Sequence, residues 1–179
     1  MFYCFLADGF EEIEALATID ILRRADIPVT TVGVTGKVVL GSHKIPVTSD
    51  VTIDEFEIDA DTLGVILPGG MPGVNNLYAN DTVKEAVLFC SSHDLYVCAI
   101  CAAPSILGRL NILKGKKATC FPGFEEYLYD AEPLTDKVVV DGKIITAKGA
   151  GCAMDFGFAI VSEVDSPALA DKVSSSMQC

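Results

Sequence analysis

The stretch that decides the fold is Val97-Cys98-Ala99-Ile100-Cys101-Ala102-Ala103-Pro104, because here an apolar strand runs into a helix with almost no loop. Residues 95–100 form an apolar run typical of a strand that is covered on both faces of a sheet. The helix is expected over residues 103–110, with Pro104 near its first position, where a missing N–H costs nothing. Cys101 therefore lies at a sharp strand-to-helix corner, which is the position of a nucleophile elbow.

The same alternation of strands and helices continues on both sides of this corner. It favours βαβ units around a mostly parallel sheet, and a chain of 179 residues has the size of one ordinary domain. We therefore predict one domain over residues 1–179, an α/β flavodoxin-like (Rossmann-like) three-layer sandwich with an appended β-hairpin. The strands are expected at residues 2–7, 29–34, 63–67, 95–100 and 117–120, the hairpins at 38–48 and 138–146, and the other main helices at 11–24, 82–92, 152–162 and from 167 to about 173.

Composition narrows the classes of function. The formal net charge of −12 and the pI near 4.4 argue against nucleic acid or an anionic membrane surface as a partner. Apolar runs stay well short of the roughly 20 residues that a membrane span requires, and the first residues lack the basic segment of a secretory signal. We expect a cytoplasmic protein whose seven cysteines are free thiols, since their number is odd and their spacing irregular.

Cys101 is the candidate nucleophile. The N-terminus of the following helix is expected to lower the pKa of its thiol from about 8.5 into the range of about 3.5 to 7.5. Gly69 and Gly70 follow the neighbouring strand, where their backbone N–H groups are free of side chains. Together with the N–H of Ala102, they are candidates for an oxyanion site. The competing interpretation is a cysteine that merely packs in the core and a Gly-Gly turn without further function.

Three glutamates, Glu11, Glu12 and Glu14, follow the first strand at the same carboxyl edge of the sheet. Sites of open α/β sheets gather at this edge, so one of the three is a candidate to reach the thiol. The alternative is that all three only complement the helix dipole. The residues alone do not choose among them.

The other cysteines are expected to be less special. Cys98 and Cys101 are spaced as C-x-x-C, but in a strand their Cα atoms lie about 10 Å apart, beyond the roughly 7 Å reach of a disulfide. Cys98 is therefore assigned to the core, as are Cys4 and Cys90. A resolving role in oxidation is left open for Cys120 and Cys152.

The two histidines limit any Cys-His mechanism. His93 closes a helix, where an imidazole complements the dipole, whereas His43 lies in the hairpin region and is a possible accessory to the site. We find no spacing of metal ligands and no cofactor motif, so neither a metal nor a cofactor is predicted.

Several of these motifs together resemble the ThiJ/PfpI superfamily, the DJ-one-like branch of the class I glutamine amidotransferase-like fold group. The resemblance covers nearly the whole chain. The motifs that carry it are residues 9–14 (Gly-Phe-Glu-Glu-Ile-Glu), 20–25, 67–70 (Leu-Pro-Gly-Gly), 99–104 (Ala-Ile-Cys-Ala-Ala-Pro) and 149–151.

The resemblance implies roles for individual residues. It makes Cys101 the elbow cysteine, Glu14 its hydrogen-bonded and protonated partner, and Gly70 and Ala102 the oxyanion-type N–H donors. It also implies a homodimer with the first helix at the interface, in keeping with the apolar residues found nearly all round residues 11–24.

Three functions remain open from the resemblance. The leading hypothesis is glyoxalase III or deglycase-type chemistry on small reactive carbonyls. The second is a non-catalytic oxidative-stress sensor or chaperone that uses oxidation of Cys101. The weakest is a PfpI-like cysteine peptidase, because peptidase-like members have histidine directly after the nucleophile and this chain has Ala102. The chain also has His43 where relatives often have arginine, and Phe121 where some have histidine.

Overall fold

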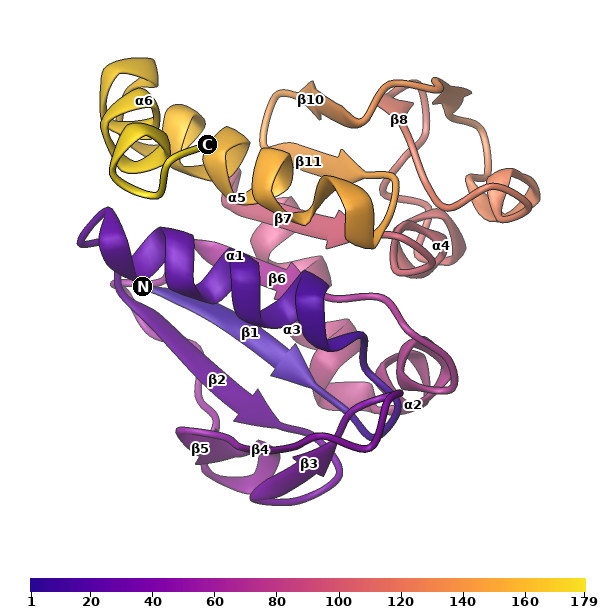
Figure 1. The fold of residues 1–179 in the computed structure, drawn as a ribbon. Helices are drawn as coiled ribbons and strands as arrows, with labels where there is room; N and C mark the ends of the chain where they lie inside the picture. Colours follow the sequence, from indigo (N-terminus) through magenta and orange to yellow (C-terminus); the bar gives the residue numbers. More distant parts are fainter.

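A seven-stranded sheet forms the centre of the computed structural model, which describes residues 1–179 (Figure 1). The strand order is β10-β11-β7-β6-β1-β2-β5, and all pairs are parallel except the hairpin of β10 with β11. The predicted α/β sheet is therefore confirmed. The strands are β1 (Phe2–Leu6), β2 (Val29–Gly33), β5 (Val51–Thr52), β6 (Gly64–Leu67), β7 (Tyr96–Ile100), β10 (Val138–Asp141) and β11 (Ile144–Ala147).

Helices cover both faces of the sheet and complete three layers. Successive residues of a strand point to opposite faces, so Phe2, Cys4 and Leu6 enter one core while Tyr3 and Phe5 enter the other. The first core packs α1 (Glu12–Arg24), α5 (Ala153–Val164) and α6 (Pro167–Ser176) against the sheet; the second packs α2 (Gly73–Ala79), α3 (Asp81–Ser92) and α4 (Pro104–Arg109).

The small elements depart from the sequence prediction in instructive ways. The predicted hairpin forms as β3 (Val38–Leu40) and β4 (Pro46–Thr48), but as a separate two-stranded sheet, while the unpredicted β5 joins the main sheet. Helix α2 was not predicted, because Pro72 and two asparagines interrupt the short apolar pattern that would indicate a helix. Helix α3 begins one residue before the predicted bound, and the Asn80 side chain caps it by accepting the N–H of Val83.

The remaining elements are short. They are β8 (Lys117–Ala118), β9 (Glu132–Pro133) and the 3₁₀ turns η1 (Ile53–Glu55), η2 (Glu125–Tyr127) and η3 (Ala150–Cys152). No helix combines the length and apolarity needed to cross a lipid bilayer.

Candidate active site

The backbone of Cys101 is held in a left-handed conformation at the corner between β7 and α4. Its φ is 64°, a region that costs a residue with a side chain about 1–2 kcal/mol. Two hydrogen bonds fix it: the Cys101 N–H donates to the carbonyl of Ala147 at 2.8 Å, and its carbonyl accepts the N–H of Phe121 at 2.8 Å. Cys101 is half-buried at this corner.

Two glycines bring backbone close to this thiol. A side chain at Gly69 would begin 2.5 Å from Cβ of Cys101, so only glycine fits there, and Gly70 has a φ of 90°. The N–H groups of Gly70 and Ala102 face the Cys101 sulfur, where their hydrogen bonds act to lower its pKa. The N–H of Gly69 goes elsewhere, since it donates to Oε2 of Glu14 at 2.8 Å. Gly69 thus supports the carboxyl group and not the oxyanion site.

Glu14 is the glutamate that reaches the thiol. Its side chain is 1% exposed, and its carboxyl group is hydrogen-bonded to Cys101. The second oxygen, Oε1, has no nitrogen or oxygen partner. Burial raises the pKa of Glu14 to about 7, against the opposing effect of the hydrogen bonds from Cys101 and Gly69. A carboxyl group in this state exchanges a proton at neutral pH.

The pKa of the thiol moves in the direction opposite to the one expected. Burial and then the negative charge of ionised Glu14 raise the pKa of Cys101 to about 12, although the N–H groups of Gly70 and Ala102 oppose the shift. The helix argument fails because α4 has only six residues and the thiol lies against a carboxylate. Near neutral pH the thiol therefore keeps its proton while Glu14 titrates, and the N–H donors stabilise the sulfur when the thiol proton moves to ionised Glu14.

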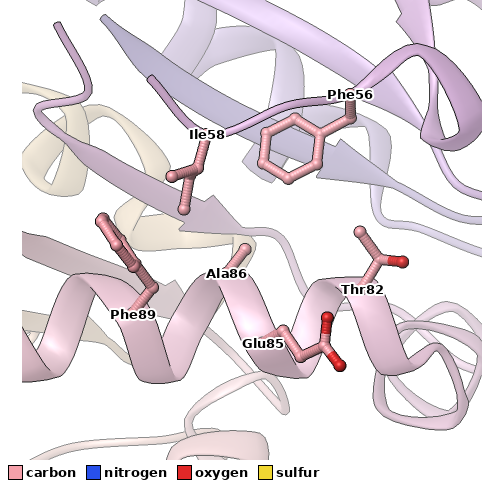
Figure 2. Close-up of a pocket in the computed structure, with 6 residues that line it drawn as sticks. All are labelled: Phe56, Ile58, Thr82, Glu85, Ala86 and Phe89. Carbon is pink, nitrogen blue, oxygen red and sulfur yellow. The ribbon is translucent and has the colours of Figure 1, made fainter. Parts of the chain in front are cut away.

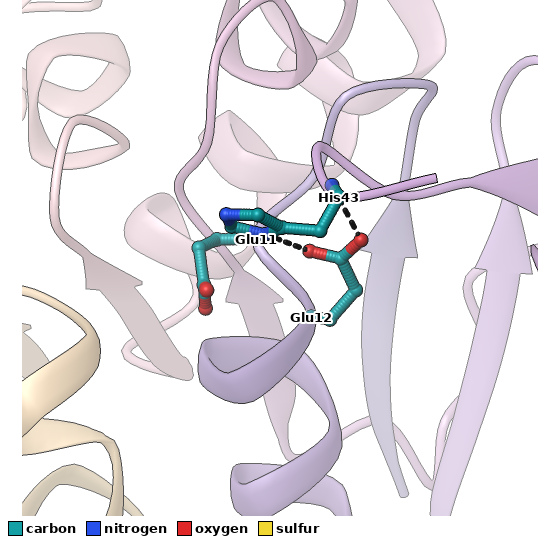
Figure 3. Close-up of side chains that lie close together, drawn as sticks. All are labelled: Glu11, Glu12 and His43. Carbon is teal, nitrogen blue, oxygen red and sulfur yellow. Dashed lines mark hydrogen bonds and ion pairs between the residues drawn. The ribbon is translucent and has the colours of Figure 1, made fainter. Parts of the chain in front are cut away.

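The other two glutamates have different partners. Glu11 caps α1, where its Oε2 accepts the N–H of Glu14 at 2.8 Å. Glu12 accepts the N–H of His43 at 2.7 Å and bonds its Nδ1 at 2.9 Å, and the hydroxyl of Ser42 adds a third contact at 3.1 Å. Figure 3 shows the pair of Glu12 and His43, with the carboxyl group of Glu11 turned away.

His43 thus anchors the loop between β3 and β4 to the start of α1 and does not bond Cys101 or Glu14. Its side chain is 71% exposed, and the hydrogen bond and charge of Glu12 raise its pKa. Possible ligand atoms of Glu11, Glu12 and His43 lie within 4.8 Å of one another, but those of Glu12 and His43 already bond each other and Glu11 caps the helix. This network ties a loop in place.

The remaining cysteines follow the sequence prediction where it was definite. Cys4, Cys90 and Cys98 are fully buried in the cores, and burial raises the pKa of each thiol. Cys120 is 4% exposed, and burial raises its pKa to about 11. All seven thiols are free.

Sequence reasoning missed the backbone partners of the elbow, Ala147 and Phe121, and the bond between Glu12 and His43. The first two act through main-chain groups, which any residue type supplies, so the sequence carries no signal for them. The third had a signal, three adjacent glutamates near a lone histidine, but the choice of partner depends on how the β3–β4 loop packs.

Comparisons with known proteins agree with this geometry. The DJ-1/PfpI family matches residues 2–163. DJ-1 homolog B of Arabidopsis thaliana is 35% identical over 160 residues, which are 88% of this chain but 36% of that protein, so the chain spans about a third of that relative's length. Among solved structures, a cysteine-to-alanine mutant of the DJ-1 superfamily protein STM1931 from Salmonella typhimurium superposes with a TM-score of 0.93 at 32% identity, covering 99% of this chain and 97% of that one. Oxidised Toxoplasma gondii DJ-1 gives 0.91 at 26% identity, with coverage of 99% and 97%.

Proposed function

This chain belongs to the DJ-1/PfpI family, and we propose that it is a cofactor-free, cysteine-dependent enzyme acting on small reactive carbonyls such as 2-oxoaldehydes. The observation that carries the proposal is the pairing of the Cys101 thiol with a buried carboxyl group, Glu14, whose pKa is raised to about 7. A general acid and base is most effective when its pKa lies near the working pH. The pair has the two groups that addition to an aldehyde needs.

In the first step, the Cys101 sulfur forms a bond to the aldehyde carbon while the C=O π bond breaks. The thiol proton passes to ionised Glu14, and the negative charge develops on the former carbonyl oxygen. We assign the stabilisation of this oxyanion to the N–H groups of Gly70 and Ala102, because both face the sulfur to which the substrate becomes bonded. Protonated Glu14 then returns its proton to the oxyanion, which gives a hemithioacetal and leaves Glu14 ionised for the second step.

In the second step, Glu14 moves a proton between neighbouring carbons. It removes the hydrogen from the carbon bound to sulfur and returns a proton to the adjacent carbon, by way of an enediol, so that a thioester of a 2-hydroxy acid results. Water then breaks the C–S bond, releases the acid and restores the thiol. The overall reaction adds one water to one 2-oxoaldehyde and needs no oxidant or reductant.

The test is product formation from methylglyoxal by Cys101→Ser, with Cys98→Ser as the matched control. Each variant replaces one thiol, Cys98 in the middle of β7 and Cys101 directly after that strand, but only Cys101 interacts with Glu14. We expect 2-hydroxy acid, measured by chromatography, to disappear with Cys101→Ser and to persist with Cys98→Ser. Turnover that survives Cys101→Ser would refute the proposal.

The second candidate is an oxidative-stress sensor or chaperone, in which Cys101 is oxidised to a sulfinate. Two features favour it: the N–H donors at the sulfur, and the unpartnered Oε1 of Glu14, which when protonated can donate to a sulfinate oxygen. A similar structure is that of an oxidised DJ-1. Peptide mass spectrometry after graded peroxide distinguishes the candidates, since a sensor gains two oxygens at Cys101 before the other thiols react. Uniform oxidation of all seven would count against it.

The peptidase hypothesis has the least support, since neither histidine bonds the thiol. A fluorogenic peptide assay in which the Cys101→Ser protein keeps full activity would eliminate it.

We further propose that the chain forms a homodimer through α1. Ile13 and Leu16 are 58% and 40% exposed on this helix, whose other side packs against α5. Apolar side chains on a helix that already has a covered face indicate a second contact surface. Sedimentation of Ile13→Glu should give a monomer where the wild type gives a dimer.

A further inference from the structure

A second hollow lies away from Cys101, between α3 and the loop that follows η1. Figure 2 shows Phe56 and Ile58 on the loop facing Ala86 and Phe89 on the helix. The cavity has a volume of about 240 Å³, and Thr82 and Glu85 complete its lining. It shares no residue with the site around Cys101.

The loop places apolar side chains inward and acidic ones outward. Phe56 packs edge-on against Tyr3 and Phe5, at 4.8 and 5.1 Å between ring centroids, and this contact fixes its ring at the cavity wall. The acidic residues of η1 and of the loop are all exposed, and one of them lies on each side of both Phe56 and Ile58. They are Asp54, Glu55, Glu57, Asp59 and Asp61.

The positive charges nearest to this cavity are already engaged. Lys84, the nearest lysine on α3, bonds Asp81 and lies over the Tyr78 ring. The terminal amino group of Met1 donates to the backbone carbonyl of Asp61. His93 stacks on Phe89, with ring centroids 3.9 Å apart. No cation pairs with Glu85, which lines the cavity itself.

We propose that this cavity binds a small organic cation with an apolar body, of the aralkylammonium class. A dry cavity of about 150 Å³ accepts a benzene ring, so this one has room for a ring with a short chain. The faces of Phe56 and Phe89 attract a cation, and Glu85 offers a carboxylate for a charge-assisted hydrogen bond. The surrounding acids raise the local concentration of cations and repel anions.

The experiment is a titration of the full-length, isotope-labelled protein with 2-phenylethylammonium, followed by NMR amide shifts. Two probes of the same shape serve as comparisons, neutral 2-phenylethanol and anionic 3-phenylpropanoate. We expect saturable shifts confined to residues 56–58 and 82–89 for the ammonium ion, at least fivefold weaker binding of the alcohol, and no binding of the carboxylate.

Two variants test the two parts of the site. Glu85→Gln removes the charge in the cavity and should weaken ammonium binding at least threefold, whereas Glu126→Gln removes an exposed glutamate of η2 and should change it less than twofold. Ala86→Met fills the cavity and should abolish binding. Equal binding of ammonium and alcohol, equal effects of the two glutamine variants, or shifts spread over the acidic surface would each overturn the proposal. These comparisons hold even if Ala86→Met does not fold.

Discussion

Two buried glutamates two residues apart on α1 have pKa values that are shifted in opposite directions. Burial opposes ionisation of both, yet hydrogen bonds from His43 and Ser42 lower the pKa of Glu12 to about 2. Glu14 receives one N–H, from Gly69, beside the thiol, and burial raises its pKa to about 7. The difference teaches that burial alone does not set the charge of a carboxyl group; the number of donors turned toward it does.

The largest expected difference between the two glutamates is in turnover, and it appears when Glu14 loses its ability to accept a proton. Glu14→Gln keeps the acceptor for Gly69 but cannot take the thiol proton, so turnover of methylglyoxal should fall by about 10² to 10⁴-fold. Glu12→Gln should retain turnover within about threefold of wild type, because Glu12 does not contact Cys101. Steady-state rates of both purified variants decide this, and a similar loss in both would mean that the region acts as a whole.

Because the pKa values of Glu14 and Glu12 are shifted in opposite directions, the two residues should affect the pH dependence of stability in opposite ways. The raised pKa of Glu14 contributes stability that is complete below 4.5, its ordinary pKa, and is lost as the pH rises through about 7. Glu14→Gln mimics the neutral acid, so it should be more stable than wild type above pH 7, by about 3 kcal/mol. Urea unfolding at pH 5 and pH 8 measures this. Parallel pH profiles of wild type and variant would show that Glu14 titrates normally.

The contribution of Glu12 to the free energy of unfolding should change with pH in the opposite direction and by a smaller amount. Its lowered pKa contributes stability that is present above 4.5 and is lost as the pH falls through about 2. Glu12→Gln should therefore cost about 1–2 kcal/mol at pH 7, reduced by solvent around the exposed His43, and the difference should close in acid. Urea unfolding from pH 7 to pH 3 follows it, and a constant gap would refute the assignment.

The smallest expected effect is on His43. Its bond to Glu12 raises its pKa above the ordinary value of 6.5, and Glu12→Gln should return it toward that value. The C–H signals of the imidazole in a pH titration report this directly, with His93 as the internal reference. If the pKa of His43 were the same in Glu12→Gln as in the wild type, the imidazole would not contact Glu12 in solution.

The sequence predicts the sheet and the corner better than the chemistry at the corner. Apolar runs and the abrupt change at Cys101 determine strand positions, because both depend on local patterns. The identity of the glutamate that meets the thiol was left open by the residues and came from the family resemblance. The direction of the pKa shift at Cys101 was wrong, because it depends on the carboxyl group and the burial that the tertiary structure supplies.

Some misses follow from geometry that no pattern encodes. Gly69 was expected to face the oxyanion, but its N–H donates to the Glu14 carboxyl group, which the tertiary structure brings from α1. The hairpin of β3 and β4 was recognised, yet not its separation from the main sheet.

The left-handed backbone at Cys101 also sets how the protein would evolve. A side chain at this φ costs about 1–2 kcal/mol, which glycine would not incur. In laboratory selection for heat resistance alone, position 101 is therefore a place where glycine should accumulate and reactivity should vanish. The cysteine is kept only under selection for its reactivity, so stability and function favour different residues at position 101.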